Sequence, residues 1–369
     1  MKVLITGGGT AGHINPALAI ADTIKKNIPS AEIEFVGTPR GLENTLVTKA
    51  GYKLHHVNIM GISRSLSLKN VKAAMLMITS QREAKKIIKE FKPDIVIGTG
   101  GYVCWPALKV AAKMGIPTLA HESNARPGLA IKQLQGNLDK ILVNFKDSAK
   151  YINNQDKVIH VGNPLRGGFG GIDYSAAREK LGIKNDETYV LAFGGSLGAQ
   201  RINETLFEYM KNSASKNSKV VCHLATGKNY YKDFSSKFAS EKLNECENLS
   251  MMEYIHDMHV RMSAADVIVC RAGAMTISEL AMMKKACVII PSPNVVDNHQ
   301  YKNAKVLADA NAAVMLEESV LDEKSFADAV NRLIENPSKR EELGKNISQF
   351  ANLDANKLIF DEIIKLTNK

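Results

Sequence analysis

The sequence has few of the residues that build metal centres, disulfide frameworks or nucleic-acid interfaces. Its five cysteines occur singly, which is typical of a reduced compartment and favours neither a zinc site nor disulfides; they are Cys104, Cys222, Cys246, Cys270 and Cys287. No Asp-x-Asp occurs, and no pair of histidines or cysteines has ligand spacing on one element, so we expect no metal and no other cofactor. The chain has one tryptophan and no recognisable nucleic-acid-binding motif, so we expect no nucleic-acid partner.

Long hydrophobic runs are also missing. No apolar stretch approaches the roughly 20 residues that cross a bilayer, and residues 1–6 read as a β-strand and not as a signal peptide. We therefore expect no membrane-integral segment. The 369 residues suit two globular domains. A net charge of +10 suits an anionic membrane surface or polyphosphate ligands.

Short apolar runs that do not alternate with polar residues recur along the whole chain. They predict strands of a parallel sheet that is covered on both faces, at Val3–Thr6, Ile33–Val36, Ile95–Ile97, Thr118–Ala120, Ile141–Val143, Tyr189–Phe193, Val220–Leu224, Val267–Cys270 and Val288–Ile290. Helical patterns separate them. In Pro16–Lys26, for example, Ala17, Ile20 and Ile24 share one face, and Pro16 suits a first turn. This alternation predicts a doubly wound α/β fold.

The two halves of the chain repeat one arrangement, a strand followed by a glycine-rich turn and a helix. Val3–Thr6 precedes Gly7–His13, and Val190–Phe193 precedes Gly194–Gln200. Between the halves, Gly162–Gly171 is dense in turn residues and reads as a linker. We predict two Rossmann-like domains, residues 1–163 and 164–349, that face each other across a cleft.

A glycine turn between a parallel strand and a helix directs backbone N–H groups and the positive end of the helix dipole at an anion. Such turns occur at Gly7–Gly12, Gly98–Tyr102 and Gly194–Gln200, which suggests two phosphorylated ligands. The first also matches the dinucleotide fingerprint. An NAD-linked dehydrogenase, however, needs an acidic residue at the end of the second strand, whereas Glu32 and Glu34 stand at its start. We therefore disfavour that activity.

Polar residues follow several of the predicted strands. His13 lies at a helix N-terminus, where the dipole favours the neutral imidazole of a general base or hydrogen-bond donor. His121–Asn124 would be hard to satisfy in a core and therefore favours a site. Arg271–Glu279 predicts another anion site, although Thr276-x-x-Glu279 also reads as a helix capping box. The polar run Asp297–Asn303 is typical of sugar recognition.

In their order along the chain, these segments and Gly162–Arg166 resemble the GT-B glycosyltransferases, and most closely the MurG family of peptidoglycan N-acetylglucosaminyltransferases. The departures are Ala11, Ala272 and His299, where members often carry glycine, serine and glutamine. The resemblance implies inverting, metal-independent transfer of N-acetylglucosamine from UDP-GlcNAc. The acceptor would be the 4-hydroxyl of MurNAc in undecaprenyl-diphosphoryl-MurNAc-pentapeptide (lipid I), and the product lipid II.

The resemblance also implies roles for individual residues. His13 is the expected base or acceptor-positioning residue. In the donor domain the backbone at Ile255 would read the uracil, Glu279 would hold the ribose and Gln300 the sugar. The other expected UDP-GlcNAc-binding residues are Thr10, Ala11, Gly12, Asn124, Arg166, Ser196, Ala274, Met275, Thr276, Ile277 and Ser278. The expected acceptor-binding residues are Gly98, Gly100, Gly101, Tyr102, His121 and Glu122.

An acceptor on a lipid carrier implies a peripheral position on the cytoplasmic face of the cell membrane. Leu66–Ile78, followed by the basic Arg82, Lys85 and Lys86, is a candidate docking segment, and an ordinary buried helix is equally consistent with it. Cell-wall synthesis proteins are candidate partners. As in the relatives, a helix within residues 350–369 is expected to pack back on the first domain.

Other activities remain open. A GT-B enzyme could transfer a UDP-sugar to another lipid acceptor, and a UDP-GlcNAc epimerase shares the architecture but needs no lipid surface and no second phosphate loop. A non-catalytic binding module is disfavoured, because it would not need His13, Glu279 and Gln300 together.

Overall fold

The chain divides into two compact units. The computed structural model describes residues 1–61, 68–167 and 169–368, with only the backbone described for 68–72. The first unit comprises Met1–Arg166 and Asn352–Lys369, and the second comprises Gly167–Ala351. The division after residue 166 falls inside the expected linker, three residues beyond the boundary placed after residue 163.

The first unit is built on a seven-stranded parallel sheet of order β3-β2-β1-β4-β5-β6-β7. Its strands are β1 (Lys2–Thr6), β2 (Glu32–Gly37), β3 (Lys53–His56), β4 (Ile95–Gly98), β5 (Thr118–Glu122), β6 (Lys140–Val143) and β7 (Val158–His160). In the centre of the sheet, Val3 of β1 pairs with Ile33 on one side and with Ile95 on the other. The strand order reverses between β1 and β4, which is where ligands of doubly wound sheets bind.

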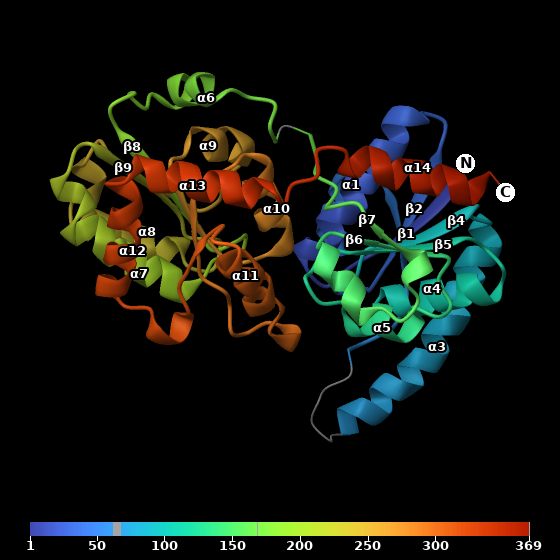
Figure 1. Ribbon diagram of the computed structural model, residues 1–369. Coiled ribbons are helices and arrows are strands. Elements are labelled where there is room, and N and C mark those ends of the chain that lie inside the picture. The colour runs from blue at the N-terminus through green and yellow to red at the C-terminus, as the bar shows by residue number, and fades with distance from the viewer. Residues whose placement is uncertain (62–67, 168, 369) are drawn as a thin grey trace. The chain divides into compact units, whose positions relative to one another are not determined.

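Helices cover both faces of this sheet (Figure 1). They are α1 (Ala11–Asn27), α2 (Glu43–Lys49), α3 (Leu68–Phe91), α4 (Cys104–Lys113), α5 (Leu129–Leu134) and α14 (Ala355–Thr367). Val3 and Ile5 of β1 pack with α1 and α14, whereas Leu4 packs with α3, α4 and α5. A strand that is buried on both faces reads as a continuous apolar run, because neither set of its side chains meets water.

The start of α1 corrects one expectation. The sequence placed Pro16 in the first turn of this helix, but α1 begins at Ala11, so Pro16 lies inside it. The glycine turn passes directly into the helix, and His13 lies in the first helical turn, as the sequence analysis expected.

The second unit repeats the design with a six-stranded parallel sheet of order β10-β9-β8-β11-β12-β13. Its strands are β8 (Thr188–Phe193), β9 (Val220–Ala225), β10 (Leu249–Met252), β11 (Val267–Cys270), β12 (Cys287–Ile289) and β13 (Val314–Met315). Its helices are α6 (Tyr174–Leu181), α7 (Gln200–Asn212), α8 (Tyr231–Ser240), α9 (Met258–Ala264), α10 (Ala274–Met282), α11 (His299–Asp309), α12 (Glu323–Ile334) and α13 (Pro337–Ser348). The order reverses between β8 and β11.

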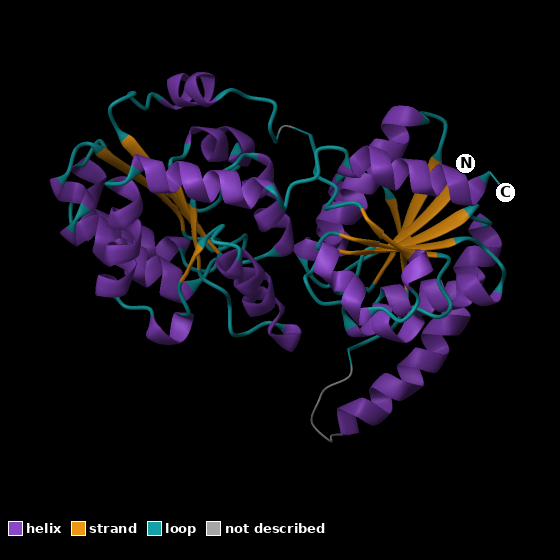
Figure 2. Cartoon of the chain, in the orientation of Figure 1, coloured by secondary structure: helices purple, strands orange, loops and turns teal. Residues whose placement is uncertain are grey.

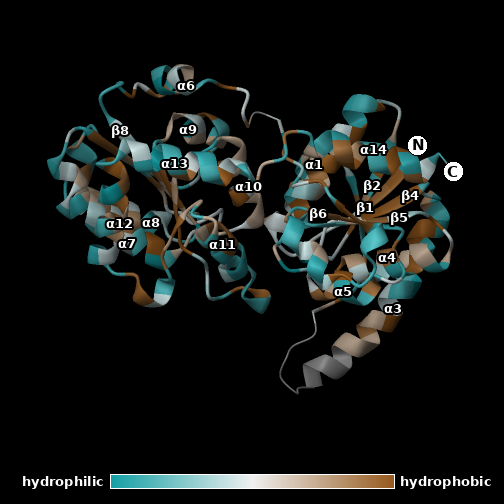
Figure 3. Cartoon of the chain, in the orientation of Figure 1, coloured by the Kyte–Doolittle hydropathy of each residue, from teal (hydrophilic) through white to brown (hydrophobic). Residues whose placement is uncertain are grey.

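All nine predicted strands are present, and the predicted α/β class with two doubly wound parallel sheets is confirmed (Figure 2). The four strands that the sequence did not predict are β3, β7, β10 and β13. Each is the outermost strand of its sheet. Figure 3 shows the apolar strands in the interior of each unit and polar residues on the outward faces of the helices.

Candidate active site

Two glycine turns meet at the point where the strand order of the first sheet reverses. Gly7–Gly12 follows β1, and Gly98–Tyr102 includes the end of β4 and the turn after it. The turns are joined by hydrogen bonds: Gly8 N–H donates to Gly100 O over 3.4 Å, and the Thr99 hydroxyl donates to His13 O over 2.7 Å. The N-terminus of α1 opens at the same place, so a positive helix end and exposed Thr10 and Gly12 face outward there.

His13 is held in one orientation by its own turn. Its Nδ1 lies 3.1 Å from Gly8 O and 3.3 Å from Thr10 Oγ1. A carbonyl oxygen only accepts hydrogen bonds, so Nδ1 is the protonated nitrogen that donates to Gly8, and in the neutral ring Nε2 carries the lone pair. This is the tautomer that a base acting through Nε2 requires.

Glu43 is a site residue that the sequence analysis missed. It begins α2, is wholly buried, and accepts hydrogen bonds from Gly9 N–H (3.0 Å) and from Thr38 N–H and Oγ1 (both 2.8 Å). Burial opposes its ionisation, but the hydrogen bonds from Gly9 and Thr38 outweigh burial and hold its pKa below the usual value. Glu32 and Glu34 stand at the start of β2, and no acid stands at its end. The cluster Gly37, Gly41 and Glu43 just beyond was the available signal.

The polar residues at the end of β5 are satisfied inside the protein. His121 Nε2 donates to Gly162 O over 2.9 Å, and the Glu122 carboxylate accepts from the backbone N–H groups of Asn124 (2.9 Å) and Gly128 (2.8 Å). Burial lowers the pKa of His121 to about 4 and raises that of Glu122. Residues that the sequence analysis expected to be hard to satisfy in a core therefore do find partners there, so their polarity alone does not indicate a site. Direct acceptor contact by His121 and Glu122 stays a prediction.

The other predicted residues of the first unit differ in accessibility. Tyr102 is 42% exposed beside the first glycine turn, and burial of the rest of its ring, with the charge of Glu43, raises its pKa. Gly98 is buried, and a Cβ there would lie 2.5 Å from Leu108 Cδ1, so it serves the packing of β4 against α4. Asn124 is partly buried. Arg166 donates to Asp22 over 2.8 Å. Asp22 lies in α1, nine residues beyond His13, so the structure does not bring Arg166 to the glycine turns.

In the second unit the turn after β8 is held by the segment after β9. Lys228 N–H donates to Ser196 O over 3.2 Å, and Asn229 N–H to Leu197 O over 3.4 Å. Gly198 has φ +88°, and a Cβ there would lie 2.0 Å from Thr226 O, so only glycine fits. Ser196 is exposed at the tip of this turn, just before the N-terminus of α7. The arrangement is that of an anion-binding turn.

The segment after β11 corrects another expectation. Gly273 is the N-cap of α10, so Thr276 lies inside the helix and Thr276-x-x-Glu279 is not a capping box. Ile277 and Ser278 are buried in the core, with exposed fractions of 1% and 5%, whereas Thr276 and Glu279 are partly exposed. Ala274 and Met275, at the start of the helix, are also mostly buried. Arg271 pairs with Glu318, so its charge is already balanced by a carboxylate.

Glu279 differs from the other carboxylates in its surroundings. Among the described residues, none forms a hydrogen bond or ion pair with its side chain, and burial raises its pKa to about 8. A carboxylate without a protein donor can accept hydrogen bonds from a ligand, and two adjacent hydroxyls would suit its two oxygens.

The remaining two donor-site candidates also follow strands of the second sheet. Ile255 lies after β10, and the residue as a whole is only 4% exposed, so a contact between its backbone and the uracil stays a prediction. Gln300 lies in the first turn of α11, and its Oε1 accepts from Ser292 N–H over 2.9 Å. Just before it, Asp297 and Asn298 have φ of +57° and +49°, an uncommon conformation that is concentrated at functional sites.

Within the described part of the chain, no group of three or more His, Cys, Asp or Glu side chains is placed to hold a metal ion, and no helix is long and apolar enough to span a membrane. The candidate docking segment Leu66–Ile78 lies partly outside the described residues, since residues 66–67 are not described and only the backbone of 68–72 is.

Comparison with known proteins covers both units. Residues 3–143 match the glycosyltransferase family 28 N-terminal domain, and residues 189–359 match the family 28 C-terminal domain. A UDP-N-acetylglucosamine--N-acetylmuramyl-(pentapeptide) pyrophosphoryl-undecaprenol N-acetylglucosamine transferase from Acetivibrio thermocellus is 42% identical over 365 residues, 99% of this chain and 98% of that protein. Its counterpart from Thermoanaerobacter sp. is 40% identical over the full length of both.

Solved structures agree with this comparison. The crystal structure of Acinetobacter baumannii MurG has a TM-score of 0.77 and 27% identity, and covers 99% of both chains. A UDP-GlcNAc 2-epimerase from Neisseria meningitidis, bound to UDP-GlcNAc, has a TM-score of 0.67 over 99% of this chain, but at 17% identity it shows the fold alone.

Two doubly wound parallel domains, each with a glycine turn and a helix N-terminus where its strand order reverses, form the GT-B architecture, and the family 28 matches make the chain a glycosyltransferase. The relatives narrow this class further. The chain belongs to glycosyltransferase family 28 and, within it, to the MurG group.

Proposed function

We propose that this protein transfers N-acetylglucosamine from UDP-GlcNAc to the 4-hydroxyl of MurNAc in the undecaprenyl-linked acceptor, the step that makes lipid II for peptidoglycan. The observation that carries the proposal is the 42% identity, over 99% of the chain, to a transferase named for this reaction. The structure adds a chemical reason, because each unit presents an anion-binding turn where its strand order reverses and each of the two substrates contains a diphosphate.

The second unit is the proposed donor domain. The turn around Ser196 and the N-terminus of α7 would bind the diphosphate, and the backbone at Ile255 would read the uracil. Glu279 would accept hydrogen bonds from the ribose hydroxyls, a role supported by its lack of a described protein partner. Gln300 would contact the transferred sugar, with residues 274–276 lining the nucleotide.

The first unit is the proposed acceptor domain. The acceptor diphosphate would bind the Gly7–Gly12 and Gly98–Tyr102 turns. His13 Nε2 would take the proton of the acceptor hydroxyl as its oxygen attacks the anomeric carbon. The bond from that carbon to the diphosphate oxygen breaks, and UDP leaves with the electron pair. Backbone N–H groups in fixed positions would stabilise the charge that develops on the leaving diphosphate.

Peripheral attachment to the cytoplasmic face of the cell membrane is part of the proposal. The first unit contains 26 Lys and Arg against 14 Asp and Glu, and the second contains 22 against 24, so the first unit carries the excess positive charge. Helix α3 extends beyond the rest of this unit (Figure 1), with Met75 and Ile78 65% and 59% exposed. Apolar side chains beside basic residues suit docking on anionic lipid.

Release of UDP from UDP-GlcNAc, measured in EDTA with and without a lipid I analogue, tests the proposed reaction. We expect release that depends on the analogue, persists in EDTA, and falls on the order of 10²-fold or more in His13→Ala. An epimerase would process UDP-GlcNAc without an acceptor. A folded, UDP-binding protein that shows no analogue-dependent release would contradict the proposal.

A further inference from the structure

One peptide unit of the first glycine turn is held at both ends. This is the peptide between Gly8 and Gly9, whose N–H donates to Glu43 Oε2 over 3.0 Å and whose carbonyl accepts from His13 Nδ1 over 3.1 Å. A buried carboxylate, a peptide and an imidazole therefore form a continuous hydrogen-bonded chain. In catalytic triads a carboxylate fixes the tautomer of a histidine by directly accepting a hydrogen bond from its Nδ1–H. Here a peptide lies between the two side chains.

The glycines around this chain leave room for it. A Cβ on Gly8 would lie 2.7 Å from Glu43 Oε1, and one on Gly41 would lie 2.1 Å from Oε2, so a side chain at either position would displace the Glu43 carboxylate. On the opposite side, a Cβ on Gly101 would lie 2.5 Å from Gly8 O, and one on Gly100 would lie 2.5 Å from His13 Cδ2. The glycines of both turns therefore pack around the hydrogen-bonded chain itself.

A peptide flanked by two glycines needs such support. Glycine rotates into either half of conformational space at little cost, and Gly9 already has φ +84°. Rotation of this peptide would withdraw the carbonyl that holds His13 Nδ1. The Glu43 carboxylate opposes rotation because it is buried, accepts three hydrogen bonds, and is itself fixed by Thr38 at the end of β2.

We propose that Glu43 is a positioning residue that fixes the orientation and tautomer of His13 through the Gly8–Gly9 peptide. Its ionised carboxylate holds the peptide N–H, and the peptide carbonyl holds His13 Nδ1–H, which keeps the proton of the neutral ring on Nδ1. The expected effect on turnover rests on the proposed base function of His13. The expected effect on the orientation and tautomer of His13 does not depend on that function.

Glu43→Gln tests this chain of contacts. The three groups that contact the carboxylate are all donors, and a glutamine amide can turn its oxygen towards Thr38 or towards Gly9 but not both. If the oxygen stays with the two Thr38 donors, the amide NH₂ faces Gly9 N–H and the peptide must move. Thr38→Val is the matched control, because it removes one donor to the other carboxylate oxygen and leaves the Gly9 contact in place.

Two measurements apply to the full-length variants. The first is steady-state turnover with UDP-GlcNAc and a lipid I analogue, with UDP affinity as the check that the protein is folded. The second is ¹⁵N NMR of histidine-labelled protein, with the His13 signals assigned by their loss in His13→Ala. In wild type we expect His13 to carry its proton on Nδ1.

In Glu43→Gln we expect the Nδ1–H tautomer of His13 to be no longer the main one. We also expect kcat to fall about 10²-fold, as for loss of a positioned base, while UDP affinity and the KM for UDP-GlcNAc stay unchanged. Thr38→Val should keep kcat within about threefold of wild type, because the hydrogen bond it removes is to Glu43 Oε1 and Gly9 N–H still donates to Oε2.

An Nε2–H tautomer in wild-type His13 would overturn the proposal even if no variant folds. So would an unchanged tautomer in folded Glu43→Gln, or an equal loss of turnover in Thr38→Val. If His13→Ala keeps its turnover, His13 is not the base, and the proposed function of His13 is wrong. The tautomer of His13 in wild type and in Glu43→Gln still tests whether Glu43 acts through the peptide.

Discussion

At the scale of the residue, Glu279 links nucleotide binding to pH. Burial raises its pKa to about 8, so much of it is protonated at neutral pH in the free protein. The ionised form accepts two hydrogen bonds from a ribose and the protonated form fewer, so binding of UDP should release a proton. From pH 9 down to pH 7 we expect UDP affinity to fall about tenfold. Titration calorimetry at pH 7 and pH 9, in two buffers of different ionisation enthalpy, measures the UDP affinity and the number of protons released on binding. Glu279→Gln should bind UDP weakly and without this dependence; an equal dependence in that variant would contradict the assignment.

His121 belongs to the same scale and concerns stability. Burial lowers its pKa to about 4 from an ordinary 6.5, so the unfolded chain takes up its proton first as the pH falls. The stabilisation is complete above pH 6.5 and is lost from there towards pH 4. Between pH 7.5 and 5.5 the loss is about 1.4 kcal/mol. His121→Asn keeps a donor for Gly162 but does not titrate, so its urea unfolding should depend less on pH than that of wild type. Parallel curves for the two proteins would show that His121 does not contribute.

At the scale of the element, the turn after β8 depends on close contact with the segment after β9. A Cβ at Gly198 would lie 2.0 Å from Thr226 O, so Gly198→Ala must displace the turn that carries Ser196. We expect UDP affinity to fall roughly tenfold or more, as for loss of an anion-stabilising donor. Gly182→Ala is the control: its φ is also left-handed, at +71°, but the new Cβ meets nothing within 4 Å. Titration with UDP measures the affinity of both variants. Equal affinities would show that the turn still binds UDP after the displacement caused by Gly198→Ala.

The strands at the edges of both sheets show what a local pattern cannot predict. Lys53–His56 and Val158–His160 contain lysine or histidine, and Val314–Met315 is only two residues long. An edge strand has a neighbour on one side only, so it tolerates polar and short segments that lack the continuous apolar run of an inner strand.

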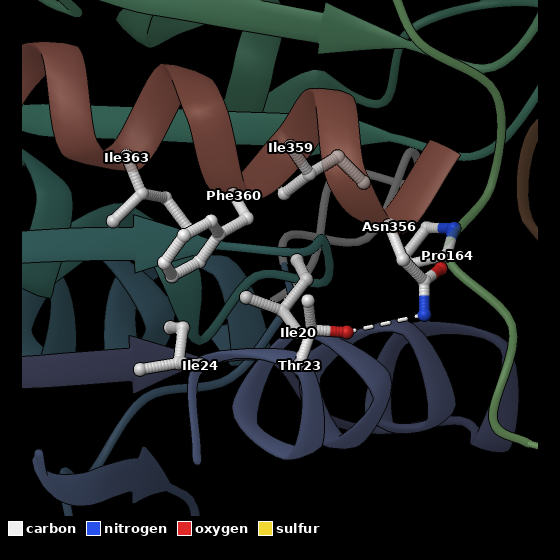
Figure 4. A pocket seen from close by; sticks show the side chains of 8 residues that line it. All are labelled: Ile20, Thr23, Ile24, Pro164, Asn356, Ile359, Phe360 and Ile363. Atoms are coloured by element: carbon white, nitrogen blue, oxygen red, sulfur yellow. Dashed lines mark hydrogen bonds between the residues drawn. The ribbon is translucent and has the colours of Figure 1, made fainter. Parts of the chain in front are cut away.

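At the scale of the whole molecule, the last helix stabilises the unit that contains the first strand. Ile20 and Ile24 of α1 face Ile359, Phe360 and Ile363 of α14, and Asn356 donates to Thr23 Oγ1 over 3.1 Å (Figure 4). Asn356 also bonds to both backbone groups of Leu165, at 3.0 Å and 2.9 Å, next to the point where the chain leaves the first unit. The C-terminal segment thus belongs to the fold of the first unit.

Replacing a buried residue of α14 should therefore destabilise the first unit. Ile363 is 0% exposed, and Ile363→Ala should lower the free energy of unfolding of that unit by about 2–5 kcal/mol. Ile364→Ala, at a partly exposed position on the same helix, is the matched control and should cost less. Calorimetry with and without UDP distinguishes the units, since UDP should raise the transition of the second unit in both variants. A shift of the UDP-sensitive transition by Ile363→Ala would contradict this assignment.

The sequence by itself determined the α/β class, the nine inner strands, the glycine turns and the position of His13 at the start of a helix. These depend on hydrophobic periodicity and turn chemistry within a few residues of each position. Only the tertiary structure decided that Glu43 reaches Gly9 across 34 residues, that Gly162 satisfies His121 across 41 residues, and that α14 packs on α1. The physical reason is that a buried polar group needs whichever partner the order of the strands brings beside it, and that order follows from the packing of the whole sheet and not from the residues next to the group.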